Sequence, residues 1–197
     1  DVEVSSYWDT LLVKVKKPWE YLGGRFSDGS LLRARLTDVV KVSKKGELRG
    51  SDEMANLFQP LFEPSPTTSL NGYVRTKNYI VLNVLDNLKH HLVRWRYDKT
   101  GEWKKENVAS TYTSSNAFDS ISIWAVDTDY ADDAFVTVES FTNPTTLYYS
   151  KSINEIEVGK NYGIKLRQQP SFFATDGIET QQHWVTSKDG TMVPYFL

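Results

Sequence analysis

Short, mostly apolar runs separated by polar turns recur along this chain. Three of them, residues 9–15, 78–84 and 133–138, share a polar first residue followed by β-branched and aliphatic residues. Such runs are typical of β-strands, and no long stretch has helical periodicity. The runs repeat at intervals longer than the about 40 to 50 residues of a propeller blade, and loop insertions account for the excess. The pattern predicts an all-β fold built from repeats.

The segments around these runs can be arranged as blades of four antiparallel strands. The middle unit has strands at 69–76, 79–85, 91–97 and 103–108, and the next unit has strands at 120–126, 134–141, 145–150 and 155–158. The first unit begins near Trp8 and has its third strand at 31–36, but it lacks a convincing inner strand. A polar insertion at 37–55 forms either a short helix or an ordered loop. We therefore expect a partial β-propeller of about three blades.

The last sixteen residues predict a β-hairpin. Trp184 and Val185 precede a turn at 187–190 that contains Asp-Gly, and apolar residues from Met192 to Phe196 follow it. A hairpin alone is only marginally stable, so this one is expected to open a further domain, and the chain is expected to be a fragment.

The hairpin and several phrases before it resemble the prolyl oligopeptidase family of serine peptidases. In the hairpin the series Ser-Lys-Asp-Gly-Thr at 187–191, followed by Met, Val and Pro, resembles the junction between propeller and peptidase domain. The other similar phrases lie at 10–15 with 29–32, 68–73 with 78–86, 142–148, 170–173 and 176–177. The resemblance covers nearly the whole chain.

The resemblance implies a domain layout. Residues 1–180 would be the C-terminal part of a seven-bladed-type propeller, with blades at about 1–66, 67–113 and 114–166 and then a linker. Residues 181–197 would be the first hairpin of the α/β-hydrolase peptidase domain. Three blades cannot close such a ring, so the isolated chain is expected to self-associate through open blade edges.

The resemblance also implies a function. The propeller would limit the access of short peptides to a catalytic domain outside this chain, in a parent serine-type endo- or oligopeptidase, and the chain alone would not be catalytic. Relatives release dipeptides, cut after basic residues or cut after proline, and these preferences stay open here. Two alternatives also stay open: a non-catalytic propeller that binds or scaffolds a partner, and a peptidase relative that has lost its nucleophile.

Composition narrows the partners. The 197 residues carry a formal charge of −2 and a pI near 6.0, which gives no reason to expect nucleic acid or an anionic membrane. No apolar run is long enough to span a membrane, and the first residues do not read as a signal peptide. The absence of cysteine excludes disulfides and thiolate sites, while both a cytoplasmic and a periplasmic location stay open.

No complete hydrolase triad is expected. The nucleophile motif Gly-x-Ser-x-Gly is absent, and Ser30 and Ser187 lack its flanking glycines. His90 and His91 are adjacent, so on a strand they point to opposite faces, and His183 is distant. These histidines are interpreted as surface or blade-edge residues rather than metal ligands. We expect no catalytic, cofactor-binding or metal-binding residue in this chain.

The charged and aromatic clusters favour structural interpretations. Asp127, Asp129, Asp132 and Asp133 do not fit a calcium loop, so a solvated turn is favoured over a cation site. Arg94 and Arg96 alternate with Val93, Trp95 and Tyr97, which favours a strand with an apolar packing face and a polar face over nucleic-acid binding. Lys41, Lys44 and Lys45 suit a solvated loop. The tryptophans are expected between blades rather than on a peptide-binding surface, and they are Trp8, Trp19, Trp95, Trp103, Trp124 and Trp184.

Overall fold

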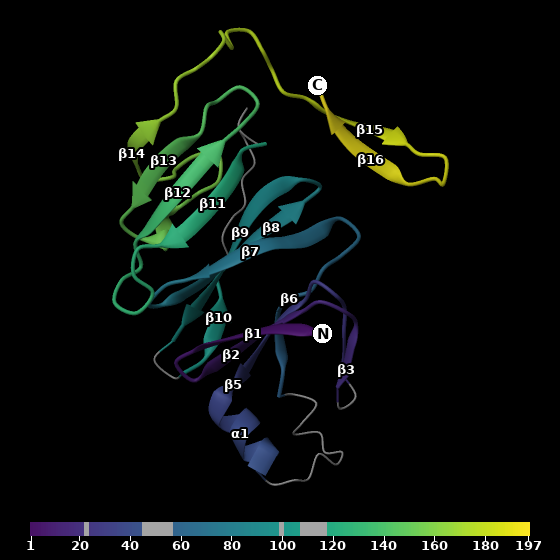
Figure 1. The fold of residues 1–197 in the computed structure, drawn as a ribbon, viewed down its shortest axis with the longest axis vertical. Coiled ribbons are helices and arrows are strands. Elements are labelled where there is room, and N and C mark those ends of the chain that lie inside the picture. The colour runs from purple at the N-terminus through teal and green to yellow at the C-terminus, as the bar shows by residue number, and fades with distance from the viewer. Residues whose placement is uncertain (22–23, 45–56, 99–100, 107–117) are drawn as a thin grey trace. The chain divides into compact units, whose positions relative to one another are not determined.

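The computed structural model describes residues 1–21, 24–44, 57–98, 101–106 and 118–197 (Figure 1). The chain divides into two compact units, Asp1–Leu70 and Asn71–Leu197. Strands account for 52% of the residues and helices for 7%, and the sheets are antiparallel, which confirms the all-β prediction. Within the described residues, no helix has the length and apolar character needed to cross a membrane.

The first unit contains a four-stranded sheet in the order β1-β2-β5-β6. Its strands are β1 (Val2–Tyr7), β2 (Thr10–Val15), β5 (Leu31–Arg35) and β6 (Gln59–Phe62), and a small hairpin of β3 (Trp19–Tyr21) and β4 (Gly24–Phe26) is inserted after β2. The expectation that this unit lacks an inner strand is wrong. Every side chain of β1 except Tyr7 is exposed, so burial does not account for this strand, and its backbone pairs with the mostly buried β2.

The polar insertion begins as a helix, α1 (Leu36–Lys44), which agrees with one of the two expected forms. The carboxylate of Asp9 accepts hydrogen bonds from the backbone N–H of Thr37, at 2.9 Å, and from its hydroxyl, at 3.0 Å. A carboxylate at a helix N-terminus satisfies otherwise unpaired N–H groups and favours the helix dipole. Residues 45–56 lie outside the described part.

The second sheet has the order β10-β9-β8-β7 and follows the predicted strands closely. The strands are β7 (Thr68–Arg75), β8 (Tyr79–Asp86), β9 (Lys89–Tyr97) and β10 (Trp103–Lys105). All residues from Tyr79 to Val84 on β8 are buried, because the strand is covered on both faces. The outer strand was predicted at 103–108, of which 107 and 108 are not described.

The third sheet has the order β11-β12-β13-β14. Its strands are β11 (Ser120–Ala125), β12 (Ala134–Glu139), β13 (Thr146–Ser150) and β14 (Ile164–Gln168). The predicted outer strand at 155–158 is wrong. A 3-10 helix, η1 (Ile153–Glu155), includes the first residue of that range, and both Ile153 and Ile156 are fully buried. Ile153 opens this helix and Ile156 follows its end in an extended conformation, and both side chains belong to the core.

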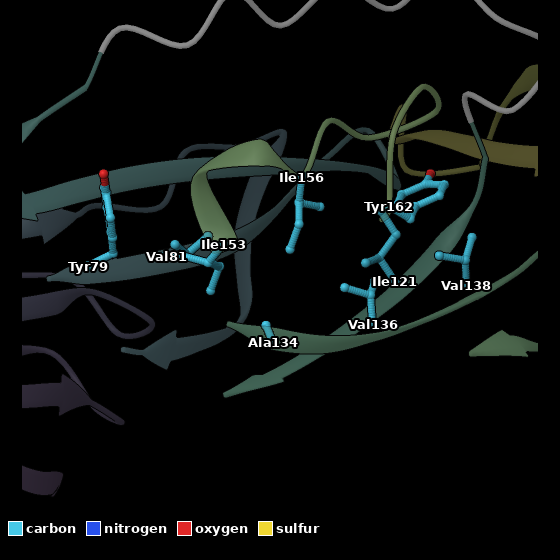
Figure 2. Close-up of a cluster of buried hydrophobic side chains, with 9 residues drawn as sticks. All are labelled: Tyr79, Val81, Ile121, Ala134, Val136, Val138, Ile153, Ile156 and Tyr162. Carbon is cyan, nitrogen blue, oxygen red and sulfur yellow. The ribbon is translucent and has the colours of Figure 1, made fainter. Parts of the chain in front are cut away.

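A single buried cluster joins the second and third sheets (Figure 2). Its members are Tyr79 and Val81 from β8, Ile121 from β11, Ala134, Val136 and Val138 from β12, and Ile153, Ile156 and Tyr162 from the segment between β13 and β14. Apolar faces of two sheets thus form one core, which fixes these two sheets against each other.

The chain ends in the predicted hairpin of β15 (Gln182–Thr186) and β16 (Met192–Phe196). Gly190 has a φ of 86°, a left-handed conformation that favours glycine in the turn. The three four-stranded sheets and this hairpin confirm the predicted fold class. The proposed blade boundaries and the assignment of residues 181–197 to a following domain stay predictions.

Candidate functional site

The candidate site is a pocket of about 490 Å³ in the second unit. The connection between β12 and β13, the segment 169–175 and the turn between β8 and β9 contribute to its wall. Five phenylalanines line it: Phe118, Phe141, Phe172, Phe173 and Phe196. Small-ligand pockets are usually concave, mostly apolar and of this size, with a few polar groups.

The phenylalanine wall is open to solvent on one side. Phe196 packs against Phe118 with ring centroids 5.0 Å apart and against Phe141 at 5.7 Å. Phe172 is 87% exposed, Phe141 is 63% exposed and Phe173 is 60% exposed. Such adjacent exposed rings are typical of a surface that contacts another molecule or another part of a protein.

Two ionisable side chains line the pocket. The carboxylate of Glu139 accepts a hydrogen bond from the Thr145 hydroxyl at 2.6 Å, which orients it. His90 is buried and its Nδ1 lies 2.7 Å from Oδ1 of Asn83. Because Asn83 donates from Nδ2 to the Ile121 carbonyl at 2.8 Å, its Oδ1 is an acceptor, and His90 therefore donates from Nδ1. Burial lowers the pKa of His90, which keeps the ring neutral at pH 7.

A strained turn forms the rim of the pocket. Asn87 and Leu88, the central residues between β8 and β9, have φ values of 48° and 69°. Two positive φ angles occur in type I′ turns, where glycine and asparagine are preferred, so a leucine at this position is unusual. Leu88 is 45% exposed and lines the pocket. The Gln182 amide donates to the Asn87 carbonyl at 2.9 Å, which ties the terminal hairpin to this turn.

The three histidines do not form one site. His91 Nε2 lies 3.8 Å from the Asp86 carboxylate, and His183 stacks on Tyr195 with ring centroids 5.5 Å apart. His90 was interpreted as a surface or blade-edge residue; the surface interpretation is wrong, because the side chain is buried. Among the described residues, no group of three or more His, Cys, Asp or Glu side chains could hold a metal ion.

The aspartate cluster is only partly a solvated turn. Asp127 accepts hydrogen bonds from the backbone N–H groups of Asp129, at 2.8 Å, and Tyr130, at 3.0 Å, as a turn residue does. Asp133 accepts from the Tyr149 hydroxyl at 2.9 Å within the third sheet. The solvated-turn interpretation therefore holds for Asp127 and fails for Asp133.

Asp132 also departs from that interpretation, because it joins two sheets. Its Oδ1 accepts from the Thr76 hydroxyl at 2.7 Å and the Asn78 N–H at 2.8 Å, and its Oδ2 accepts from the Asn78 amide at 2.6 Å. Thr76 and Asn78 belong to the turn between β7 and β8, whereas Asp132 precedes β12. We call these three residues the carboxylate clasp.

Arg94 does not face solvent, although it was predicted to lie on a polar face of β9. This side chain is 4% exposed and donates a hydrogen bond to the Ile156 carbonyl. In the pairing of β8 with β9, Arg94 lies opposite Val81. Burial lowers the pKa of its guanidinium. Arg96, by contrast, is exposed over the Tyr79 ring at 6.0 Å. The predicted separation into an apolar packing face and a polar face is therefore wrong: Val93, Trp95 and Tyr97 are only half-buried, and Arg94 is the most buried residue of this group.

The predictions for the lysines and for the tryptophans agree with the structure only in part. Lys41 pairs with Asp38 at 3.2 Å on α1, Lys44 is the last residue of that helix, and Lys45 is not described. Trp103 is buried, Trp19 packs on Phe58, and Trp95 is half-buried, whereas three tryptophans expected between blades are exposed, namely Trp8, Trp124 and Trp184.

Neither serine is placed as a nucleophile. Ser30 is fully buried, where substrate does not reach it, and the Ser187 hydroxyl donates to the Asp189 carboxylate in the terminal turn. Sequence reasoning missed the pocket residues Leu88 and Glu139. The sequence signals that fall on the pocket are His90, the phrases at 142–148 and 170–173, and Phe196 of the terminal hairpin, but no local pattern showed that they lie together.

Comparison with known proteins places the fold. No family model matches the chain. The chain is similar to the uncharacterized peptidase y4nA of Sinorhizobium fredii, with 34% identity over 138 residues, which is 70% of the length of this chain. A post-proline cleaving enzyme from Rickettsia typhi matches the whole chain with a TM-score of 0.71 and 20% identity. Prolyl oligopeptidase B from Galerina marginata, solved with a bound 35mer substrate, also matches the whole chain, with a TM-score of 0.54 and 16% identity.

The chain spans only part of these proteins. It covers 17% of the Sinorhizobium peptidase, 25% of the Rickettsia enzyme and 23% of the Galerina enzyme. The sequence relationship is to a peptidase, and the shared fold is that of a segment of post-proline cleaving enzymes.

Proposed function

We propose that this chain is one segment of a serine peptidase and limits the access of substrates to its active site. The chain has the propeller fold of the prolyl oligopeptidase family and is related in sequence to a bacterial peptidase. The observation that carries the proposal is the match of the whole chain, three four-stranded sheets and the terminal hairpin together, to the post-proline cleaving enzyme.

The physical argument is exclusion. A ring of blades surrounds a central channel, and a narrow channel admits a flexible peptide while it excludes a folded domain. Short peptides would reach a peptidase domain that this chain does not contain, where acyl transfer needs an activated serine. The peptide-bound Galerina structure supports a peptide as the class of substrate.

The terminal hairpin supports a domain junction. Its apolar side chains Trp184, Val185, Met192 and Val193 are exposed in this structure. An isolated two-stranded hairpin with open apolar faces gains stability by packing on further strands. We therefore assign residues 181–197 to the start of the peptidase domain, as the resemblance implies.

The test uses the full-length protein that contains this chain. The specificity constant kcat/KM is measured for a short proline-containing peptide and for the same cleavage sequence placed in a surface loop of a stable folded domain. We expect hydrolysis of the short peptide and at least about a hundredfold lower kcat/KM for the folded substrate.

Two results would contradict the proposal at different levels. Equal hydrolysis of both substrates would show that access is not limited, although the peptidase activity would stand. No hydrolysis of any peptide, by a protein shown by circular dichroism to be folded, would favour a non-catalytic binding module.

A further inference from the structure

The phenylalanine pocket has the features of a binding site in its own right. We propose that it binds a peptide segment in which a large apolar side chain stands next to a cationic group: the apolar side chain enters among the phenylalanine rings, and the cation pairs with Glu139. The proposal rests on the proposed function only in taking the ligand to be a peptide.

The apolar half of the proposal follows from the rings. A pocket of about 490 Å³ is large enough for a bulky side chain and its backbone. Phe141, Phe172 and Phe173 are all more than half exposed in this chain, so their surfaces are accessible to a ligand. Burial of apolar surface is the main favourable contribution to such binding, and aromatic rings contribute most per residue.

The cationic half follows from charge complementarity. Among the lining residues that the structure describes, Glu139 is the one carboxylate, and Thr145 holds it in place. His90 is the only other ionisable group of the lining, and it is neutral for the reason given above. The Lys89 ammonium lies 5.1 Å from the centre of the Phe118 ring, a cation–π contact at the edge of the pocket. The lining is therefore negative at Glu139, which selects a positive charge.

The strained turn at the rim is the second observation. Leu88 holds a left-handed conformation that glycine would adopt without strain, and its side chain is almost half exposed, so core packing does not explain the leucine. Residues in sparsely populated backbone conformations cluster at active sites and ligand clamps. At the rim, Leu88 would cover the bound apolar side chain.

The cation could come from the amino terminus of a peptide or from a lysine or arginine side chain. The probe is an eight-residue peptide with one phenylalanine next to one arginine, flanked by glycine and serine, with fluorescein at its C-terminus. Matched probes replace phenylalanine by alanine, replace arginine by glutamine, or carry an acetylated instead of a free amino terminus. Binding to the 197-residue chain is followed by fluorescence anisotropy, and thermal unfolding is measured for each variant.

The variants separate binding from stability. Leu88→Gly relieves the strained turn, so its unfolding midpoint should rise by a few degrees while its affinity falls at least about fivefold. Phe172→Ala should leave the midpoint unchanged, since the ring is exposed, and also weaken binding. Glu139→Gln should lower the affinity only for the probes that carry the cation paired with Glu139. The expected loss is about two- to fivefold, as for an exposed ion pair. The acetylated and glutamine probes identify which cation that is.

Several outcomes overturn the proposal. They are no binding of the phenylalanine probe, equal binding of its alanine counterpart, or affinity that survives both Leu88→Gly and Phe172→Ala. Binding to the isolated chain but not to the full-length protein also overturns it, because the rest of the protein would then fill the pocket. Hydrolysis of a short peptide by the full-length protein is measured in a separate assay. A protein that hydrolyses the peptide but binds no probe contradicts only the proposed pocket, whereas one that binds the probe but hydrolyses no peptide contradicts only the proposed function.

Discussion

The carboxylate clasp offers the sharpest test of how the second and third sheets are held together. Asp132 accepts three hydrogen bonds from Thr76 and Asn78, and Thr76 is fully buried. Asp132→Ala removes the carboxylate that accepts these three hydrogen bonds. Hydrogen bonds to a charged group contribute about 1.5 to 3 kcal/mol each, and leaving a buried donor unsatisfied costs a similar amount.

The expected loss is smaller than the sum of three such bonds, because Asn78 is only half-buried and its amide can turn to water. We expect Asp132→Ala to lower the free energy of unfolding by about 3 kcal/mol. Asp132→Asn keeps one oxygen for the two bonds to Oδ1 and turns an amide toward the Asn78 amide, so we expect a loss of about 1 kcal/mol.

The assay is urea unfolding followed by circular dichroism, with the slope of the transition checked for each variant. Asp129→Ala is the matched control from the same loop. Its carboxylate is exposed and lies 3.5 Å from Arg75, so its removal should change stability by less than about 0.5 kcal/mol. A loss below about 1 kcal/mol for Asp132→Ala, or equal losses for the two alanine variants, would refute the reasoning.

Three further predictions concern stability and association. Burial raises the pKa of Asp119, which accepts a hydrogen bond from the Tyr162 hydroxyl at 2.7 Å. A raised carboxyl pKa gives stability that is complete below the ordinary value of 3.8 and is lost as pH rises through the folded value. Asp119→Asn should therefore gain stability relative to the unsubstituted chain between pH 3.5 and 7, as urea unfolding at a series of pH values would show; a constant difference contradicts it. Gly163 has a φ of 102°, and a Cβ there would lie 2.3 Å from the Tyr149 carbonyl oxygen, so Gly163→Ala should cost about 3 kcal/mol against about 1 for Gly177→Ala, which has an open site. Finally, light scattering of the isolated chain at rising concentration should give a mass above the monomer, because open sheet edges and faces associate; a constant monomer mass contradicts this expectation.

Local patterns determined the parts of this fold that depend on neighbouring residues. The run at 79–85 is apolar enough to form a strand covered on both faces, and the turn at 187–190 closes a hairpin through its Asp-Gly pair. Both signals lie within a few residues of the structure that they predict. The all-β class and the repeated units follow from such signals.

Tertiary structure decided the features that need partners far away in the sequence. The strand β1 is exposed and forms because β2 pairs with it, and the arginine at 94 is buried because the segment before β14 covers it. The pocket combines residues from 88 to 196, and Asp132 finds its partners more than fifty residues earlier. Burial and hydrogen-bond partners arise from these long-range contacts, which one-dimensional alternation of polar and apolar residues does not specify.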